Sequence, residues 1–171
     1  DGKVSRPGVC NSLESLVIHK DIADEFLKRV NALGNEFGIQ FKADKDSVSK
    51  LDNAEVASAE DYHNEYLSLA MSVSQADSYE AAIEHIQNHS SSHTEVIVTK
   101  DIDRGNEFVK RINSSVVMVN ASSRFSDGGE LGLGAEIGIS TSKLHAYGPM
   151  GLVQLTTEKY VVTGQGQAKH Y

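Results

Sequence analysis

The sequence has 171 residues, 16 Lys and Arg against 24 Asp and Glu, a formal net charge of −8 and 39% hydrophobic residues. This length suits one globular domain with its own core. The excess of acid, without any basic run, argues against a nucleic-acid partner, because phosphates bind Lys and Arg. The longest apolar stretches, residues 67–73 and 116–119, are far shorter than the roughly 20 residues of a membrane helix. We therefore expect a soluble protein that binds neither nucleic acid nor membrane.

The N-terminus and the cysteine content indicate a compartment. The chain begins without an apolar segment or cleavage site typical of a secretory signal. Its single cysteine, Cys10, cannot form an internal disulfide. Both features predict a cytoplasmic protein.

The first half of the chain predicts a strand, a helix and a second strand. Residues 16–19 form an aliphatic run, and Asp21 stands at the expected N-cap of a helix whose apolar residues share one face through Leu33. Residues 34–64 are weakly periodic and predict short elements and surface loops. Residues 67–73 alternate apolar with small or polar side chains, which predicts a strand with one buried face.

The second half continues the alternation. Residues 79–86 mark one face of a helix, residues 96–98 a strand, residues 102–112 a helix interrupted by Gly105, and residues 116–119 another strand. Strands that alternate with helices imply right-handed crossovers. The predicted fold class is therefore α/β, with a mainly parallel sheet sandwiched by helices.

Glycine recurs in the segment that follows residue 120, which predicts an ordered loop before a final strand and polar tail at residues 159–167. Residues 132–138 resemble a dinucleotide-binding fingerprint with one extra residue. They lie well beyond the nearest predicted strand and not on the turn that leaves it, which favours a glycine-rich loop.

Cys10 follows Pro7 and Gly8, which predict a turn, and the next residues are compatible with a helical turn. Backbone N–H groups at such a start stabilise a thiolate and can hold an oxyanion. The alternative is a buried structural cysteine, which is common for a lone cysteine.

His85, His89 and His93 have the fourfold spacing of one helical face. We expect the helix to end near His89, and no second group of Cys, His or carboxylates has ligand spacing. The sequence therefore predicts no metal site.

Arg124 stands among hydroxyl side chains directly after the strand at residues 116–119. Ligands of parallel α/β sheets collect at the carboxyl ends of strands, and a guanidinium beside serines suits a carboxylate or phosphate. A surface ion pair between Arg124 and Asp127 is an equally good interpretation.

Three segments together resemble the gamma-glutamyl phosphate reductase family of the aldehyde dehydrogenase superfamily. Residues 73–97 include Ala-Ile-Glu-His-Ile-Gln-Asn-His and His-Thr-Glu-Val-Ile, similar to the signature of that family. Residues 120–129 and 132–141 resemble its C-terminal part. The resemblance runs from end to end of the chain.

The resemblance implies an aldehyde-dehydrogenase-like catalytic domain over residues 1–155 and a C-terminal strand and tail over residues 156–171 with a role in oligomerisation. The family is roughly twice as long as this chain, comfortably two-domain in size. We therefore expect that the nucleotide-binding domain is absent, that the chain is a fragment, and that it is inactive by itself.

By the same resemblance, the parent enzyme reduces L-glutamyl 5-phosphate with NADPH to L-glutamate 5-semialdehyde and phosphate, in proline biosynthesis. Cys10 would be the catalytic nucleophile that forms a thioester. NADPH would be bound mainly by the absent domain. The implied partners are further copies of the chain and, functionally, glutamate 5-kinase.

The family resemblance also suggests roles for other residues. Glu65 corresponds to the superfamily glutamate at the nicotinamide ribose, with a solvated loop glutamate as the alternative. Tyr147 stands where the family is expected to have Arg. The substrate's glutamyl end is assigned to the loop after the strand at residues 116–119, namely to Asn120, Ser122, Arg124, Ser126 and Asp127.

Other functions remain open at this point. The signature around His93 argues against an aldehyde dehydrogenase that oxidises aldehydes. A bifunctional pyrroline-carboxylate synthase would carry the same domain. A non-catalytic assembly module would have no need of a reactive Cys10.

Overall fold

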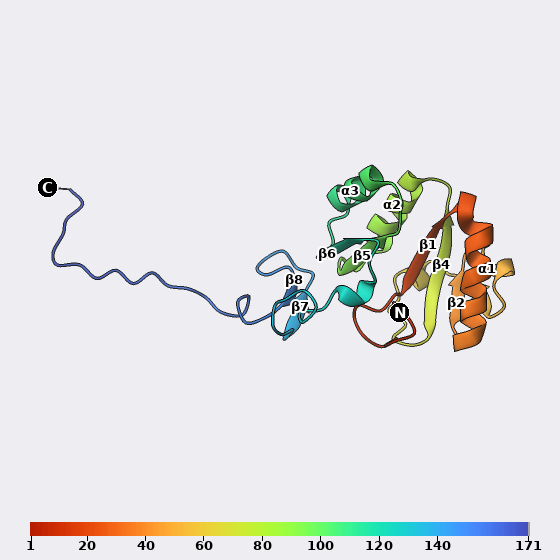
Figure 1. Ribbon diagram of the computed structural model, residues 1–171, viewed down its shortest axis with the longest axis horizontal. Helices are drawn as coiled ribbons and strands as arrows, with labels where there is room; N and C mark the ends of the chain where they lie inside the picture. Colours follow the sequence, from red (N-terminus) through yellow and green to blue (C-terminus); the bar gives the residue numbers. More distant parts are fainter. Residues whose placement is uncertain (171) are drawn as a thin grey trace.

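The computed structural model describes residues 1–170 and shows an α/β fold with an extended C-terminal segment (Figure 1). The strands and helices in chain order are β1 (Ser15–His19), α1 (Lys20–Phe37), β2 (Gln40–Ala43), β3 (Ala54–Val56), β4 (Ala70–Ala76), α2 (Tyr79–His89), β5 (Thr94–Ile97), α3 (Ile102–Arg111), β6 (Val116–Val119), β7 (Gly138–Ser140) and β8 (Gly148–Met150). Single 3-10 turns form η1 (Val48–Lys50), η2 (Glu60–Tyr62) and η3 (Ser123–Phe125).

The predicted parallel architecture is confirmed, but it is divided between two sheets. Strands β1, β4, β2 and β3 form a parallel sheet in the order β1-β4-β2-β3, and β5 pairs with β6 in a separate parallel sheet. Strands β7 and β8 form a small antiparallel hairpin. Figure 1 shows α1 along the four-stranded sheet, and α2 and α3 beside β5 and β6.

Helix α1 packs against the four-stranded sheet through a face of small and apolar residues. Ala23, Leu27 and Gly34 are buried on this face. The Phe41 ring on β2 lies so close to Gly34 that a Cβ atom on residue 34 would be 2.5 Å from it. The absence of a side chain at Gly34 therefore allows the helix to approach the sheet.

A second core joins α2 and α3. Ile83 of α2 packs with Phe108 of α3 and with Ile112, against the partly buried Ile97 and Val117 of the two-stranded sheet. Helix α2 also contacts β1 and β4. It therefore lies between the two parallel sheets and couples them.

The predicted start and end of the first helix were wrong. Helix α1 begins at Lys20, because His19 is the N-cap and its Nδ1 accepts the backbone N–H of Asp21. It continues to Phe37, where Gly38 at φ +70° ends it. Residues 34–37, expected outside any long element, are therefore helical.

Two strand predictions also need correction. Strand β4 begins at Ala70, not at residue 67, and almost all of it is buried because it lies between β1 and β2. Residues 159–167 form no strand, and the chain from residue 151 to 170 has only turns and extended backbone. Part of the glycine-rich stretch, expected to be loop, instead forms β7 and β8.

Gly105 does not interrupt α3. It is buried inside the helix, and a Cβ at this position would be 3.0 Å from Val119 Cγ1. The absence of a side chain at Gly105 therefore allows α3 to pack closely against β6.

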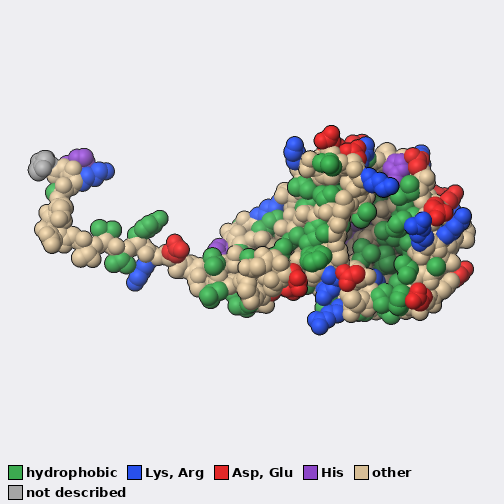
Figure 2. Space-filling view, viewed as in Figure 1, with side chains coloured by type: hydrophobic (Ala, Val, Ile, Leu, Met, Phe, Trp, Pro, Cys, Tyr) green, Lys and Arg blue, Asp and Glu red, His purple; other side chains and the backbone are tan. Residues whose placement is uncertain are grey.

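The molecular surface mixes both signs of charge over α1, and the extended C-terminal segment carries apolar side chains in the open (Figure 2). Tyr160, Val161 and Val162 are among the exposed residues of this segment. Within residues 1–170, no helix is long and apolar enough to cross a membrane.

Candidate functional site around Cys10

Cys10 lies in a loop of consecutive turns before β1, and its thiol is free and exposed. The helical turn that was expected after Cys10 does not form. A partly buried ion pair between Lys3 Nζ and Glu14 Oε2, at 2.8 Å, anchors the loop. Glu14 Oε2 also accepts the backbone N–H of Tyr66 at 3.2 Å, which places the segment containing Glu65 beside this loop.

The thiol environment combines opposing effects. Partial burial raises the pKa of the Cys10 thiol above its ordinary value, and the negative charges of Glu136 and Glu65 raise it further. The backbone N–H groups of Cys10 and Asn11 act in the opposite direction, as predicted for a thiolate held by a turn. In this chain the sum is a thiol that is protonated at neutral pH.

Asn11 connects Cys10 to the predicted substrate loop. Its buried side chain donates to the carbonyl oxygen of Ser126 at 2.9 Å, and its Oδ1 accepts from the Arg124 guanidinium. Its backbone carbonyl accepts the Ser123 hydroxyl at 2.7 Å. The structure therefore brings Arg124 of η3, and Ser126 directly after it, against the residue that follows Cys10.

The remaining loop residues have other partners. The Ser122 hydroxyl donates to the Asp1 carboxylate. Asp127 Oδ1 accepts the backbone N–H groups of Gly129 and Glu130. The alternative surface ion pair between Arg124 and Asp127 was therefore wrong, because each side chain binds elsewhere.

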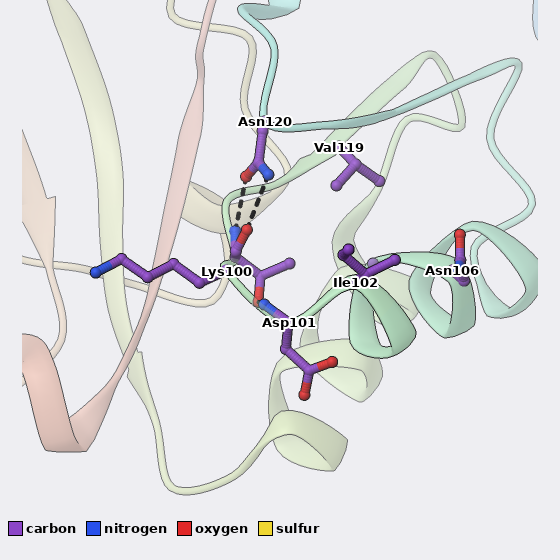
Figure 3. A pocket seen from close by; sticks show the side chains of 8 residues that line it. Lys100, Asp101, Ile102, Asn106, Val119 and Asn120 are labelled. Carbon is purple, nitrogen blue, oxygen red and sulfur yellow. Dashed lines mark hydrogen bonds between the residues drawn. The ribbon is translucent and has the colours of Figure 1, made fainter.

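Asn120 lies in a separate hollow. Its side-chain amide makes two hydrogen bonds of 2.8 Å with the backbone of Thr99 (Figure 3). The hollow has a volume of about 380 Å³ and lies at the carboxyl ends of β5 and β6, where Asp101 caps α3. The side-chain oxygen and nitrogen of Asn120 therefore both hold the loop before α3 in place.

A second hollow, of about 340 Å³, lies beside the Cys10 loop. Arg6 and Arg124 line it together with Ser5 and the acidic Asp1 and Glu130. Arg6 was not predicted from the sequence as a site residue. Its position four residues before Cys10 could have identified it, because this loop must lie close to any ligand that Cys10 binds.

The comparisons with known proteins concern the whole chain. No family profile matches it. Gamma-glutamyl phosphate reductases of Salinibacter ruber and Idiomarina loihiensis are each 54% identical to it over 99% of its residues. By sequence, the chain is therefore similar to one part of these gamma-glutamyl phosphate reductases. It spans about two fifths of these relatives, 39% and 40% of their lengths.

The solved structures agree with this relationship. The crystal structure of gamma-glutamyl phosphate reductase from Thermotoga maritima superposes with a TM-score of 0.90 at 39% identity, over 98% of this chain and 41% of that one. A propionaldehyde dehydrogenase from Clostridium phytofermentans, at 16% identity, superposes with a TM-score of 0.57 over 83% of this chain and 40% of that one. The expected aldehyde-dehydrogenase-like fold is thus confirmed.

Two predicted features of the reductase-like chain have structural roles. The Tyr147 hydroxyl, where Arg was expected, donates toward the backbone carbonyl of Asn113 at 2.7 Å and ties the hairpin to the loop before β6. Gly132 and Gly134 both adopt positive φ, 78° in each case, within the glycine-rich loop.

Within residues 1–170, no three His, Cys, Asp or Glu side chains are placed to hold a metal ion.

Proposed function

We propose that this chain is the thiol-bearing catalytic part of an oxidoreductase that converts L-glutamyl 5-phosphate and NADPH to L-glutamate 5-semialdehyde and phosphate. The observation that carries the proposal is the exposed Cys10 thiol, with two backbone N–H groups acting on its sulfur, in a chain matched throughout by gamma-glutamyl phosphate reductases. We assign this reaction to proline biosynthesis, as the family resemblance implies.

The chemistry that Cys10 would perform follows from its surroundings. The thiolate attacks the acyl carbon, the C–S bond forms, and the C–O bond to phosphate breaks. The backbone N–H groups of Cys10 and Asn11 would stabilise the oxyanion. NADPH, when bound, would supply the hydride for reduction of the thioester, and the Cys10 thiolate would be the leaving group as the aldehyde forms.

Arg124 is proposed to bind the carboxylate of the glutamyl group. Arg6 strengthens this assignment because it lines the same hollow and adds a second positive charge. Ser122 and Ser126 would add hydrogen bonds, Asp127 would face the ammonium group, and Asn120 would shape the loop. Glu65, whose charge acts on Cys10, is proposed to lie at the nicotinamide ribose.

The other parts of the proposal concern cofactor, assembly and location. NADPH would bind mainly to a nucleotide-binding domain outside this chain, so this chain alone should show no saturable NADPH binding at micromolar concentrations. The exposed apolar side chains of residues 156–170 would contact another copy; Tyr171 lies outside the described residues. A lone thiol suits the cytoplasm, and glutamate 5-kinase would supply the labile acyl phosphate.

A chimera tests the proposed reaction. The corresponding segment of the Salinibacter ruber reductase is replaced by this chain, and oxidation of NADPH with L-glutamyl 5-phosphate is measured. We expect activity in the chimera, and its loss in Cys10→Ser with NADPH affinity retained, because a hydroxyl does not form the thiolate. An active Cys10→Ser chimera would instead favour an assembly role for this chain.

A further inference from the structure

His93, the residue before β5, is buried beside the candidate site. It is 9% exposed, and its Nε2 has no hydrogen-bond partner among residues 1–170. A buried polar atom without a partner costs free energy, so such an atom in a site calls for a ligand or water. The reaction proposed above makes no use of this nitrogen.

A hydrogen-bonded chain connects the ring to the Cys10 loop. His93 Nδ1 lies 2.6 Å from Thr94 Oγ1, which donates to Ser126 Oγ at 2.7 Å. The backbone carbonyl of Ser126 accepts from Asn11, the neighbour of Cys10. Thr94 has one hydroxyl hydrogen and gives it to Ser126, so its oxygen accepts from His93. This network assigns the ring proton to Nδ1 and leaves the lone pair on Nε2.

The charged groups that act on His93 also act on Cys10. The carboxylates of Glu136 and Glu65 influence both side chains, so the imidazole and the thiol share one electrostatic environment. Burial lowers the pKa of His93 against the effect of these two carboxylates. The imidazole is therefore neutral at pH 7, and its Nε2 is available as a proton acceptor.

We propose that His93 Nε2 takes the proton of the Cys10 thiol through a bridging water and later gives it to the departing phosphate. The S–H bond breaks as Nε2 gains the proton, and the thiolate forms the C–S bond as the C–O bond to phosphate breaks. The proton leaves with phosphate, so His93 is neutral again before hydride transfer. The phosphate step rests on the proposed function, whereas the thiol step does not.

Alkylation of this chain tests the thiol step, because Cys10 is its only cysteine. The rate of reaction with iodoacetamide is measured from pH 5 to 10. We expect two rises, one with a midpoint below about 6.5 from His93 and one from direct ionisation of the thiol. His93→Gln should abolish the first rise and slow alkylation at pH 7 by about tenfold or more.

Matched variants separate this role from a structural one. Thr94→Val should shift the first midpoint without removing the rise, because it frees His93 Nδ1. His85→Gln changes a histidine of α2 that takes no part in the relay, and it should leave the profile unchanged. An unchanged profile in folded His93→Gln would overturn the proposal.

NMR provides a test if His93→Gln does not fold. In the unmodified chain, the Cys10 Cβ resonance should follow the titration of His93, and the ring should carry its proton on Nδ1. A Cβ resonance that is insensitive to the His93 titration would overturn the proposal. A failed chimera with a normal alkylation profile would reject the substrate assignment and retain the thiol and histidine pair.

Discussion

The Asn11 side chain donates a 2.9 Å hydrogen bond to the carbonyl of Ser126, 115 positions further along the chain. It is one of several bonds by which Asn11 joins the Cys10 loop to η3. The site is therefore assembled from two distant segments through one buried amide.

Asn11→Ala should lower the free energy of unfolding by about 1–3 kcal/mol, because it leaves buried partners in η3 unsatisfied. Urea unfolding followed by circular dichroism measures this loss. Asn106→Ala, on the exposed face of α3, is the control and should change stability by less than about 0.5 kcal/mol. Equal stability of the two variants would mean that Asn11 does not hold the segments together.

Gly34→Ala should destabilise the chain by about 1–3 kcal/mol through overpacking. Alanine ordinarily stabilises a helix relative to glycine by about 1 kcal/mol. Here its Cβ would meet the Phe41 ring at 2.5 Å, so packing should reverse the usual sign. Glu36→Ala, on the exposed side of α1, is the matched control in thermal unfolding. A higher melting temperature for Gly34→Ala would show that the ring moves aside at little cost.

The main ionisation of Cys10 should lie above the value of about 8.5 for an unperturbed thiol. Glu136→Gln removes a nearby negative charge but keeps an oxygen for its hydrogen bond with Gly128. The variant should therefore lower the thiol pKa and speed alkylation at pH 8, whereas Glu130→Gln should not. Identical rates in both variants would place the Glu136 charge too far from the sulfur to matter.

Stability should fall as the pH drops below about 6.5, the value for an unperturbed histidine. Burial and neighbouring histidines lower the pKa values of His85 and His89. Between the unfolded and the folded pKa values, these histidines bind protons in the unfolded chain but not in the folded chain. Their ionisation therefore leaves the free energy of unfolding unchanged above about pH 6.5 and lowers it as the pH falls toward the folded pKa values.

Urea unfolding at intervals between pH 8 and 5 measures this effect. His89→Gln should reduce the pH dependence, because it removes one of these groups and its contact with His63. His145→Gln, at an exposed position, is the control. A steeper loss in His89→Gln would contradict the assignment.

The regular elements could be predicted where periodicity and burial agree. The apolar face of α2 and the short runs of β1 and β6 follow directly from local patterns. Local patterns did not reveal β2, whose buried Phe41 and Ala43 depend on strands that are distant in sequence. The division into two sheets likewise depends on long-range pairing, which propensity does not encode.

The site was predictable only in part, for a similar reason. Cys10 stood out because it is unique and follows a turn. Arg6 and His93 did not stand out as site residues, because their significance comes from a shared hollow and from a partly buried relay between β5 and the residue that follows η3. Such residues become recognisable only when the fold brings separate segments together.

The tie between Asn11 and Ser126 also sets an order of events during protein synthesis. The ribosome makes the Cys10 loop first, but the acceptor for Asn11 is added 115 residues later. At about 5–20 residues per second, this interval is roughly 6–23 seconds. The Cys10 sulfur is therefore accessible on an incomplete nascent chain, and oxidants or electrophiles would meet it before the segment that contains Ser126 has been made.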